Sequence, residues 1–208
     1  MTSPEVHKFE GGEELAASLC DRITNVLAKG IEERGTASLI VSGGRTPKRL
    51  FSALSTTDLN WGDVEILVAD ERWVPDFDDQ SNARFLRENL LIGAASTARF
   101  SALWTSGQSA ADAANLLASE LQARREPFDA VILGMGGDGH TASLFPDAPE
   151  IDLALSAEAP AAMTLSPASQ PALRISLTPS ALVNTRFLAL HIEGHAKWDV
   201  DDDSGVAD

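Results

Sequence analysis

The segment FDAVILGMGGDGHTASLFP, residues 128–146, joins a short apolar run directly to a loop with four glycines in six residues. The run Ala130–Leu133 shows no alternation of polar and apolar residues, which is typical of a strand that is buried on both faces. Similar runs occur at Ser38–Val41, Val64–Ala69 and Phe187–Ile192. Four strands of this kind indicate a sheet that is covered on both sides.

Segments with helical patterns lie between these strands. Apolar residues recur at every third or fourth position in Glu13–Ile31 and Ser81–Leu91, while Ala110–Ala123 is rich in alanine and leucine. Strands that alternate with helices predict an α/β fold with a mainly parallel sheet. In such a sheet ligands bind beside the carboxyl ends of the strands, so we expect the functional residues directly after each strand.

The length and composition are typical of a globular protein, and the net charge disfavours binding to nucleic acid. The 208 residues fit one domain, which we expect to span residues 1–198. The net charge of −15 disfavours binding to nucleic acids or anionic membranes, because both require basic patches. Asp147–Gln170 is rich in proline, alanine and serine, which indicates a long surface connection with one short strand. Residues 199–208 are acidic and aperiodic, so we expect a disordered tail.

The sequence carries no feature of an exported or membrane-spanning protein. Met1–Phe9 lacks a basic stretch followed by an apolar run, so it does not resemble a signal peptide. No apolar run approaches the roughly 18–20 residues that a membrane span needs. Cys20 is the single cysteine, which excludes an intrachain disulfide and favours a reducing compartment. We therefore expect a soluble cytoplasmic protein.

The segment Ser42–Pro47 follows the first strand and has the composition of an anion-binding turn. Its two glycines allow a tight turn and a close approach of the backbone to a ligand. Thr46 and Pro47 suit the N-cap and the first position of a helix, whose free amides attract phosphate. An ordinary strand–turn–helix connection would have the same composition. The candidate substrate-binding residues here are Ser42, Gly43, Gly44, Arg45 and Thr46.

Three consecutive ionisable residues, Asp70, Glu71 and Arg72, follow the strand Val64–Val68. Charged groups at the end of a buried strand destabilise the fold unless they are paired with each other or bind a ligand. Arg72 can hold a phosphate or a carboxylate in a bidentate fork, and Asp70 can orient a substrate hydroxyl. A local network of ion pairs would explain the same three residues.

The glycine-rich loop of residues 134–139 leads directly to His140. A histidine in such a loop can take a proton from water near neutral pH, so we predict that His140 is a general base. Asp138 can orient His140 or the substrate, and the amides of Gly136 and Gly137 are free to contact a ligand. We expect a helix to begin at His140 and to end within about two turns at the prolines that follow. So short a helix disfavours the dinucleotide-binding fingerprint that the glycine spacing formally matches.

Two further cations follow later strands. Lys197, after Phe187–Ile192, can supply a point charge for phosphate. Arg174 lies in an apolar segment, where it is either another anion contact or a solvated strand position. His191 and His195 are four residues apart, but no third ligand is evident nearby, so we expect no metal site.

These clusters, taken in order along the chain, resemble the 6-phosphogluconolactonase family. The resemblance covers nearly the whole chain to residue 198, and the loop of residues 134–146 is its most specific part. The other matching segments are Ser42–Pro47, Asp70–Pro75 with Ser81-Asn82, Arg174–Asn184 and Gly194–Lys197. Family members usually continue past the lysine with a helix and a final strand, whereas Trp198 is here followed closely by aspartates.

The resemblance implies a Rossmann-like three-layer fold, with a mainly parallel sheet flanked by helices. It also implies hydrolysis of 6-phospho-D-glucono-1,5-lactone to 6-phospho-D-gluconate in the oxidative pentose phosphate pathway, with no metal or organic cofactor. His140 would activate a water, and Arg72 or the loop amides would stabilise the developing oxyanion. The phosphate would be held by Arg72, Arg174 and Lys197. We expect a monomer rather than an obligate oligomer.

Three other functions fit parts of the sequence. The glucosamine-6-phosphate deaminases share a similar loop, but they carry a glutamate five residues after the histidine, where this chain has Phe145. An apolar ring cannot assist the proton relay of ring opening, so Phe145 favours the lactonase. A sugar-phosphate-binding regulator would normally carry an added DNA-binding module, and none is visible in 208 residues. A dinucleotide-binding module is the remaining alternative.

Overall fold

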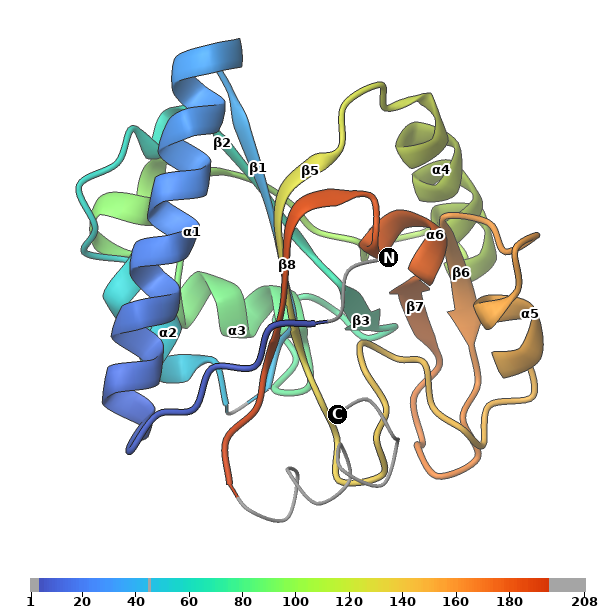
Figure 1. Cartoon of the computed structure of the whole chain (residues 1–208). Coiled ribbons are helices and arrows are strands. Elements are labelled where there is room, and N and C mark those ends of the chain that lie inside the picture. The colour runs from blue at the N-terminus through green and yellow to red at the C-terminus, as the bar shows by residue number, and fades with distance from the viewer. Residues whose placement is uncertain (1–3, 45, 195–208) are drawn as a thin grey trace.

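The computed structural model describes residues 4–44 and 46–194 of the chain. Its centre is a five-stranded sheet in the order β4-β2-β1-β5-β8, in which every pairing is parallel (Figure 1). The five strands are β1 (Ala37–Val41), β2 (Val64–Val68), β4 (Arg99–Ser101), β5 (Phe128–Gly134) and β8 (Thr185–His191). The predicted α/β fold with a mainly parallel sheet is therefore confirmed.

Helices and a second sheet cover the two faces of the parallel sheet (Figure 1). One face is covered by α1 (Gly12–Arg34), α2 (Lys48–Leu54) and α3 (Asn82–Asn89). The other face carries α4 (Ala110–Ala123) and an antiparallel sheet in the order β3-β7-β6. The remaining elements are β3 (Asp70–Arg72), β6 (Ala162–Leu165), β7 (Arg174–Leu177), α5 (Ile151–Leu155), α6 (Pro179–Leu182) and the short 3-10 helices Trp61–Asp63 and Gly93–Thr97.

The central strand β1 is buried on both faces, as its unbroken apolar sequence predicts. Leu39 packs with Ile23 and Leu27 of α1, whereas Ile40 packs with Leu177 of β7 on the opposite side. Successive side chains of a strand point to opposite faces, so both layers need apolar residues along this short run.

The helix ends follow from local sequence. Gly35 ends α1 with a φ of 75°, and its amide donates a hydrogen bond to the carbonyl oxygen of Ile31. This left-handed conformation costs glycine little. Ser81 and Ser109 begin α3 and α4, and each hydroxyl accepts a hydrogen bond from the amide three residues later.

Three local predictions are wrong. Thr46 is not the N-cap of α2, because the helix begins at Lys48 and Pro47 occupies the capping position. No helix begins at His140, because Ala142 has a φ of 50° and an α-helix cannot continue through a left-handed residue. The strand Phe187–Ile192 is not buried on both faces, because β8 is an edge strand of the described sheet, whose Leu188 and Leu190 are 47% and 45% exposed. The connection of residues 147–170 holds the expected short strand, β6, and also the short helix α5, whose Ala154 is buried in a small core of its own.

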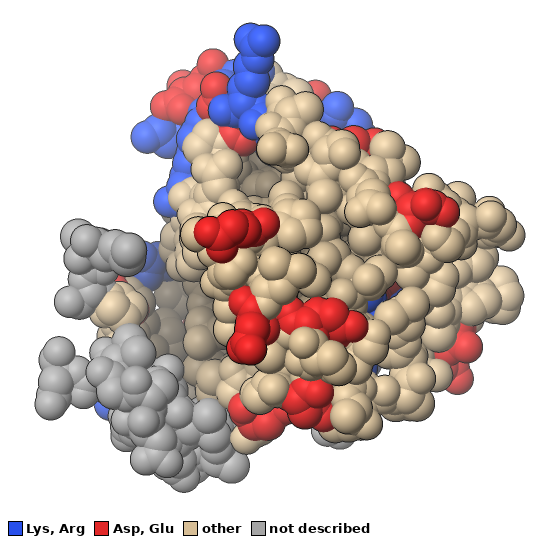
Figure 2. Space-filling model, turned by 90° about the vertical axis from the view of Figure 1, so that its right-hand side faces the viewer, with Lys and Arg blue, Asp and Glu red and all other residues tan. Residues whose placement is uncertain are grey.

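Figure 2 shows the face that α4, α5 and β6 present on the right of Figure 1. Most charged atoms across this face belong to aspartate and glutamate, while lysine and arginine gather at its upper edge. No helix in the described part of the chain is long and apolar enough to cross a membrane.

Candidate active site

The loops after β1, β2 and β5 come together at the carboxyl edge of the parallel sheet. The amide of Ser42 donates to the oxygen of Ile132 over 3.0 Å, and the amide of Ala69 donates to the oxygen of Val41 over 2.9 Å. The strand ends therefore stay aligned where the loops begin. The short strand β3 follows β2 directly and pairs with β7. The candidate site consists of these loops together with β3 and β7.

His140 and Asp138 form an acid–base pair in the loop after β5. Nδ1 of His140 lies 2.5 Å from Oδ1 of Asp138, and the two side chains are 24% and 50% exposed. Burial by itself would raise the pKa of Asp138, but the hydrogen bond and the charge of His140 outweigh it and lower that pKa. Because Asp138 engages Nδ1, the other ring nitrogen Nε2 is left to meet a water or a substrate.

The glycines of this loop let its backbone fold tightly around His140. The amide of Gly136 donates to the oxygen of His140 over 2.8 Å. A side chain at Gly136 would collide with the His140 ring and the Asp138 carboxylate. Gly139 and Ala142 both have positive φ, 82° and 50°, and alanine adopts that region rarely. The loop thus holds a conformation that few sequences allow, which is a feature of functional sites.

Phe145 contacts two of the predicted site residues. Its ring stacks on the imidazole of His140, with 3.7 Å between the ring centroids and 22° between the planes. Cζ of Arg174 lies 5.0 Å from the centroid of the same ring. The residue that separates this sequence from the deaminase pattern is therefore part of the site.

Asp70 and Arg174 form an ion pair in the protein interior, with Oδ2 of Asp70 3.8 Å from Nη1 of Arg174, and both contact the hydroxyl of Ser143. Oγ of Ser143 donates to Oδ2 of Asp70 over 2.5 Å and accepts from Nη1 of Arg174 over 3.3 Å. Nη2 of Arg174 donates to Gln170 over 2.9 Å, and Asn82 donates to Oδ1 of Asp70 over 3.3 Å. Both oxygens of Asp70 are thus engaged by protein groups, and its contact with a substrate hydroxyl stays a prediction.

Glu71 of β3 is fully buried, and its carboxylate lies against the first turn of α3. Its carboxylate accepts hydrogen bonds from the amides of Arg72, Asn82 and Ala83 and from the hydroxyl of Ser81. Burial raises the pKa of Glu71, although these four donors act in the opposite direction. The carboxylate ties β3 to the first turn of α3 and so fixes the position of Asn82.

The side chain of Asn82 joins β3 to the turn after β1. Its amide nitrogen donates to the backbone oxygen of Asp70 over 2.8 Å. A side chain at Gly43 would collide with the Asn82 amide, and Gly44 has a φ of 96°. The two glycines therefore carry the chain closely past Asn82, in agreement with the tight turn that the sequence predicts.

Arg72 and Arg174 are paired residues on β3 and β7. Burial, and then the charge of Arg72, lower the pKa of Arg174. Nη1 of Arg72 donates to the oxygen of Gln80 over 2.6 Å. The Nε of each arginine is buried and makes no hydrogen bond within residues 4–44 and 46–194. Two neighbouring guanidinium groups with unused donors favour the binding of an anion.

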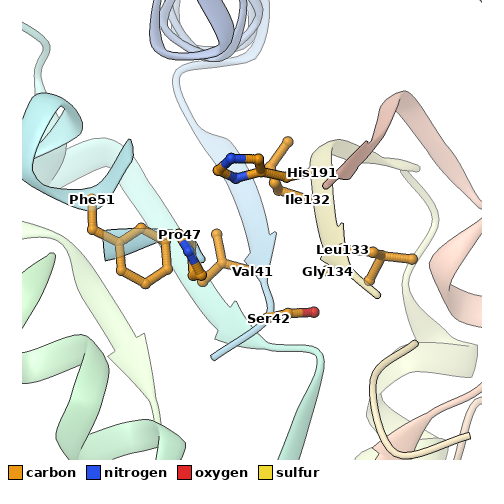
Figure 3. A pocket seen from close by; sticks show the side chains of 8 residues that line it. All are labelled: Val41, Ser42, Pro47, Phe51, Ile132, Leu133, Gly134 and His191. Atoms are coloured by element: carbon orange, nitrogen blue, oxygen red, sulfur yellow. The ribbon is translucent and has the colours of Figure 1, made fainter. Parts of the chain in front are cut away.

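A small cavity lies between the ends of β1 and β5, next to α2 (Figure 3). Its volume of about 10 Å³ is close to that of one water-sized site. Figure 3 shows Pro47 and Phe51 at one side of it, with Ser42 and His191 among the other lining residues. A larger cavity of about 330 Å³ lies between α4 and the strands β2 and β4, and none of the predicted site residues lines it.

The structure connects many of the predicted residues in one series of contacts. In order, the series runs through Gly43, Asn82, Asp70, Ser143, Arg174, Phe145, His140 and Asp138. Arg72 joins it as the partner of Arg174, and Gly136 joins it beneath His140. The predicted residues Arg45 and Lys197 and the tail of residues 199–208 lie outside the described residues. Ser42, Gly44, Thr46 and Gly137 belong to the same loops but not to this series.

The sequence alone does not identify Ser143, Asn82 and Gln170 as members of the site. Their partners come from other strands and loops, so their spacing along the chain carries no signal of the contact. Burial of a small polar residue next to a glycine-rich loop is the clue that a structure adds.

No group of three or more His, Cys, Asp or Glu side chains within the described residues could hold a metal ion.

Comparison with known proteins places this geometry in a family. The sequence model described as "Glucosamine-6-phosphate isomerases/6-phosphogluconolactonase" matches residues 10–204. The 6-phosphogluconolactonase of Rhizobium meliloti strain 1021 is 41% identical over 201 residues, which cover 95% of this chain and 86% of that protein. The enzyme of the same name from Pseudomonas putida is 39% identical over 93% of this chain and 80% of its own length.

Solved structures give the same result. The crystal structure of a 6-phosphogluconolactonase from Shewanella baltica OS155 matches with a TM-score of 0.89 and 41% identity, over 94% of this chain and 84% of that one. A 6-phosphogluconolactonase from Thermotoga maritima matches with a TM-score of 0.77 and 27% identity, over 94% and 86%. The resemblance that the sequence motifs indicate is confirmed, and the chain belongs to the family of glucosamine-6-phosphate isomerases and 6-phosphogluconolactonases.

Proposed function

We propose that this chain hydrolyses 6-phospho-D-glucono-1,5-lactone to 6-phospho-D-gluconate, a step of the oxidative pentose phosphate pathway. The observation that carries the proposal is the pairing of His140 with Asp138 beside an apolar ring, Phe145, in a chain whose relatives bear the lactonase name. A lactone is an activated ester, so one well-placed base is sufficient chemistry. The proposal includes a cytoplasmic monomer that uses no metal or organic cofactor.

His140 acts as the general base in this proposal. With Nδ1 held by Asp138, Nε2 takes a proton from a water whose oxygen bonds to the lactone carbonyl carbon. The bond between that carbon and the ring oxygen then breaks. The proton on Nε2 passes to the ring oxygen, which leaves as a hydroxyl, and His140 returns to its starting state.

Arg72 and Arg174 supply the positive charge for the substrate. Their buried Nε donors can serve the phosphate, and Arg72 or the amides of the glycine-rich loop can serve the carbonyl oxygen as it gains charge. One such donor to an oxyanion is typically worth about 3–4 kcal/mol. We assign Lys197, together with the amides of Gly43 and Gly44, to the phosphate as further contacts. Asp70 supports this arrangement through Ser143, which holds Arg174 in place.

The test is a direct assay of product formation. Purified protein is added to freshly generated lactone, and 6-phosphogluconate is measured against the spontaneous hydrolysis rate. We expect a rate well above that background, and a parallel incubation with glucosamine 6-phosphate should release no ammonia. A rate equal to the background would refute the proposal, while ammonia release would assign the chain to the deaminase branch of its family.

A further inference from the structure

Phe145 occupies an unusual position between the core and the catalytic loop. It is 4% exposed and belongs to a small core cluster with Leu144, Ala148, Ala154 and Leu165. Its amide donates to the oxygen of Ser143, and its own oxygen accepts from the amide of Ala148. The ring is therefore fixed from behind by packing and along the chain by hydrogen bonds.

We propose that Phe145 is a positioning residue that sets the plane of the His140 ring and its separation from Arg174. The inference rests on the proposed function for its catalytic consequence, but the geometry it describes is independent of turnover. Phe145 acts through His140 and Arg174 and is not assigned a contact with the reacting atoms.

The orientation of the His140 ring depends on more than its own loop. The loop backbone folds closely against one part of the His140 ring, but the side chain is 24% exposed, so the backbone alone does not fix the plane of the ring. Asp138 holds the ring at one edge through Nδ1. A single hydrogen bond at an edge leaves the ring free to rock about that bond. The stack on Phe145, with planes 22° apart, removes this remaining motion and so aims Nε2.

Phe145 also limits the distance between His140 and Arg174. The centroid of Phe145 lies 3.7 Å from that of His140 and 5.0 Å from Cζ of Arg174. The guanidinium carbon can therefore be no farther from the imidazole centre than these two distances combined. Ser143 and Gln170 hold Arg174 from the other side, so the spacing is defined at both ends. A substrate anchored by an anion at the arginines would meet His140 at a constant distance.

The test compares Phe145→Leu, which keeps an apolar side chain without the ring, with Phe145→Tyr, which keeps the ring. Leu27→Ala is the matched control, because Leu27 of α1 is fully buried in a core cluster that does not include Phe145. We expect Phe145→Leu to lower kcat by up to about 100-fold, the usual effect of a small misplacement of reacting groups. KM should change less, and the loss of kcat should be larger for the phosphorylated than for the unphosphorylated lactone, because only the phosphorylated one is anchored at the arginines. Phe145→Tyr should keep most of the activity, and Leu27→Ala should lower Tm while keeping kcat.

A spectroscopic readout separates this inference from the proposed function. The face of an aromatic ring shifts the proton resonances of a group stacked on it, so the His140 ring protons should be displaced in the wild type and in Phe145→Tyr. They should return to ordinary positions in Phe145→Leu, whether or not the protein is a lactonase. Unshifted His140 protons in the wild type, or an equal loss of kcat in Leu27→Ala and Phe145→Leu, would overturn the inference. Phe145→Met, which fills more of the ring volume, gives the same comparison if Phe145→Leu does not fold.

Discussion

Two clusters of carboxylate and arginine lie at opposite ends of the parallel sheet and differ in how completely they are paired. At the amino end of β5, Asp129 accepts hydrogen bonds from the amide and hydroxyl of Ser38. The same carboxylate forms ion pairs with Arg34 and Arg186. At the carboxyl edge, Arg72 and Arg174 each keep a buried Nε that makes no hydrogen bond within the described residues.

We propose that this difference separates a cluster that stabilises the fold from a cluster that binds a ligand. Leaving a buried donor without an acceptor costs about 1–3 kcal/mol, so a fold gains nothing from such groups. The amino-end cluster avoids this cost by joining β1, β5, β8 and α1 through one carboxylate. The carboxyl-edge cluster leaves its buried Nε donors without acceptors, which is expected where a substrate supplies those acceptors. Substitutions at the two ends should therefore separate activity from stability.

The largest expected effect is on activity at the carboxyl edge. His140→Ala should lower kcat for the phosphorylated lactone by about 10²–10⁴-fold, because general base catalysis is lost. The free energy of unfolding should change little, since the side chain is part-exposed and its partner Asp138 is half-exposed. Steady-state kinetics and urea denaturation measure the two quantities. His7→Ala, at an exposed histidine near the amino end of the chain, is the control, and unchanged kcat in His140→Ala would remove the base assignment.

The converse effect is expected at the amino end of β5. Asp129→Ala should lower the free energy of unfolding by about 3 kcal/mol, because a buried ion-pair network loses its shared carboxylate. The amide of Ser38 also loses its acceptor. At a temperature where the variant stays folded, kcat should equal that of the wild type. A tenfold fall in kcat would mean that the two ends of the sheet are coupled, and the separation of roles would be wrong.

A smaller effect is expected for the anion contact. Arg72→Ala should raise KM for the phosphorylated lactone by roughly 10–100-fold, which corresponds to a lost charge-assisted hydrogen bond of about 1.5–3 kcal/mol. Unphosphorylated δ-gluconolactone should be affected far less. Arg87→Ala, at a surface arginine paired with Asp76, provides the control. Equal losses on both substrates would instead place Arg72 at the carbonyl oxygen.

The sequence predicts the parallel sheet and its functional edge, but not the pairing that brings the two arginines together. Unbroken apolar runs such as Ser38–Val41 predict the parallel sheet, and the rule that ligands bind at its carboxyl edge directs attention to Arg72 and His140. The short strand β3 is not predicted, because three residues give no detectable period, and so its antiparallel pairing with β7 is not predicted either. Without that pairing, the neighbouring positions of Arg72 and Arg174 cannot be known.

Burial of polar residues is the second quantity that the sequence does not reveal. In the sequence, Ser143 is a small residue in a loop. It lies between Asp70 and Arg174 only because the fold brings three distant segments together. Phe145 can be recognised as a departure from the deaminase pattern, but its stack on His140 cannot. Contacts between distant segments, not residue types, are what the structure adds to the site.

The smallest expected effect is on the pH dependence of stability and concerns Asp138. The hydrogen bond and charge of His140 lower the pKa of Asp138 below its unfolded value of about 3.9, in spite of burial. The stability that this carboxylate contributes is therefore present above that unfolded value and is lost as the pH falls through the lowered pKa. Asp138→Asn should be less stable than the wild type at neutral pH, by less than about 1 kcal/mol because a half-exposed pair is screened by solvent.

Glu71 acts in the opposite direction, so the wild-type curve alone cannot isolate Asp138. Its raised pKa means that the stability it contributes is fully present below its unfolded pKa and is lost as the pH rises through the raised value. The difference between wild type and Asp138→Asn cancels this contribution, because Glu71 keeps the same four donors in both proteins. Urea denaturation of the two proteins from neutral pH to about pH 3 should show a gap that closes at the acid end. If the difference in the free energy of unfolding stayed constant with pH, the charge of Asp138 would not contribute to the stability of the loop.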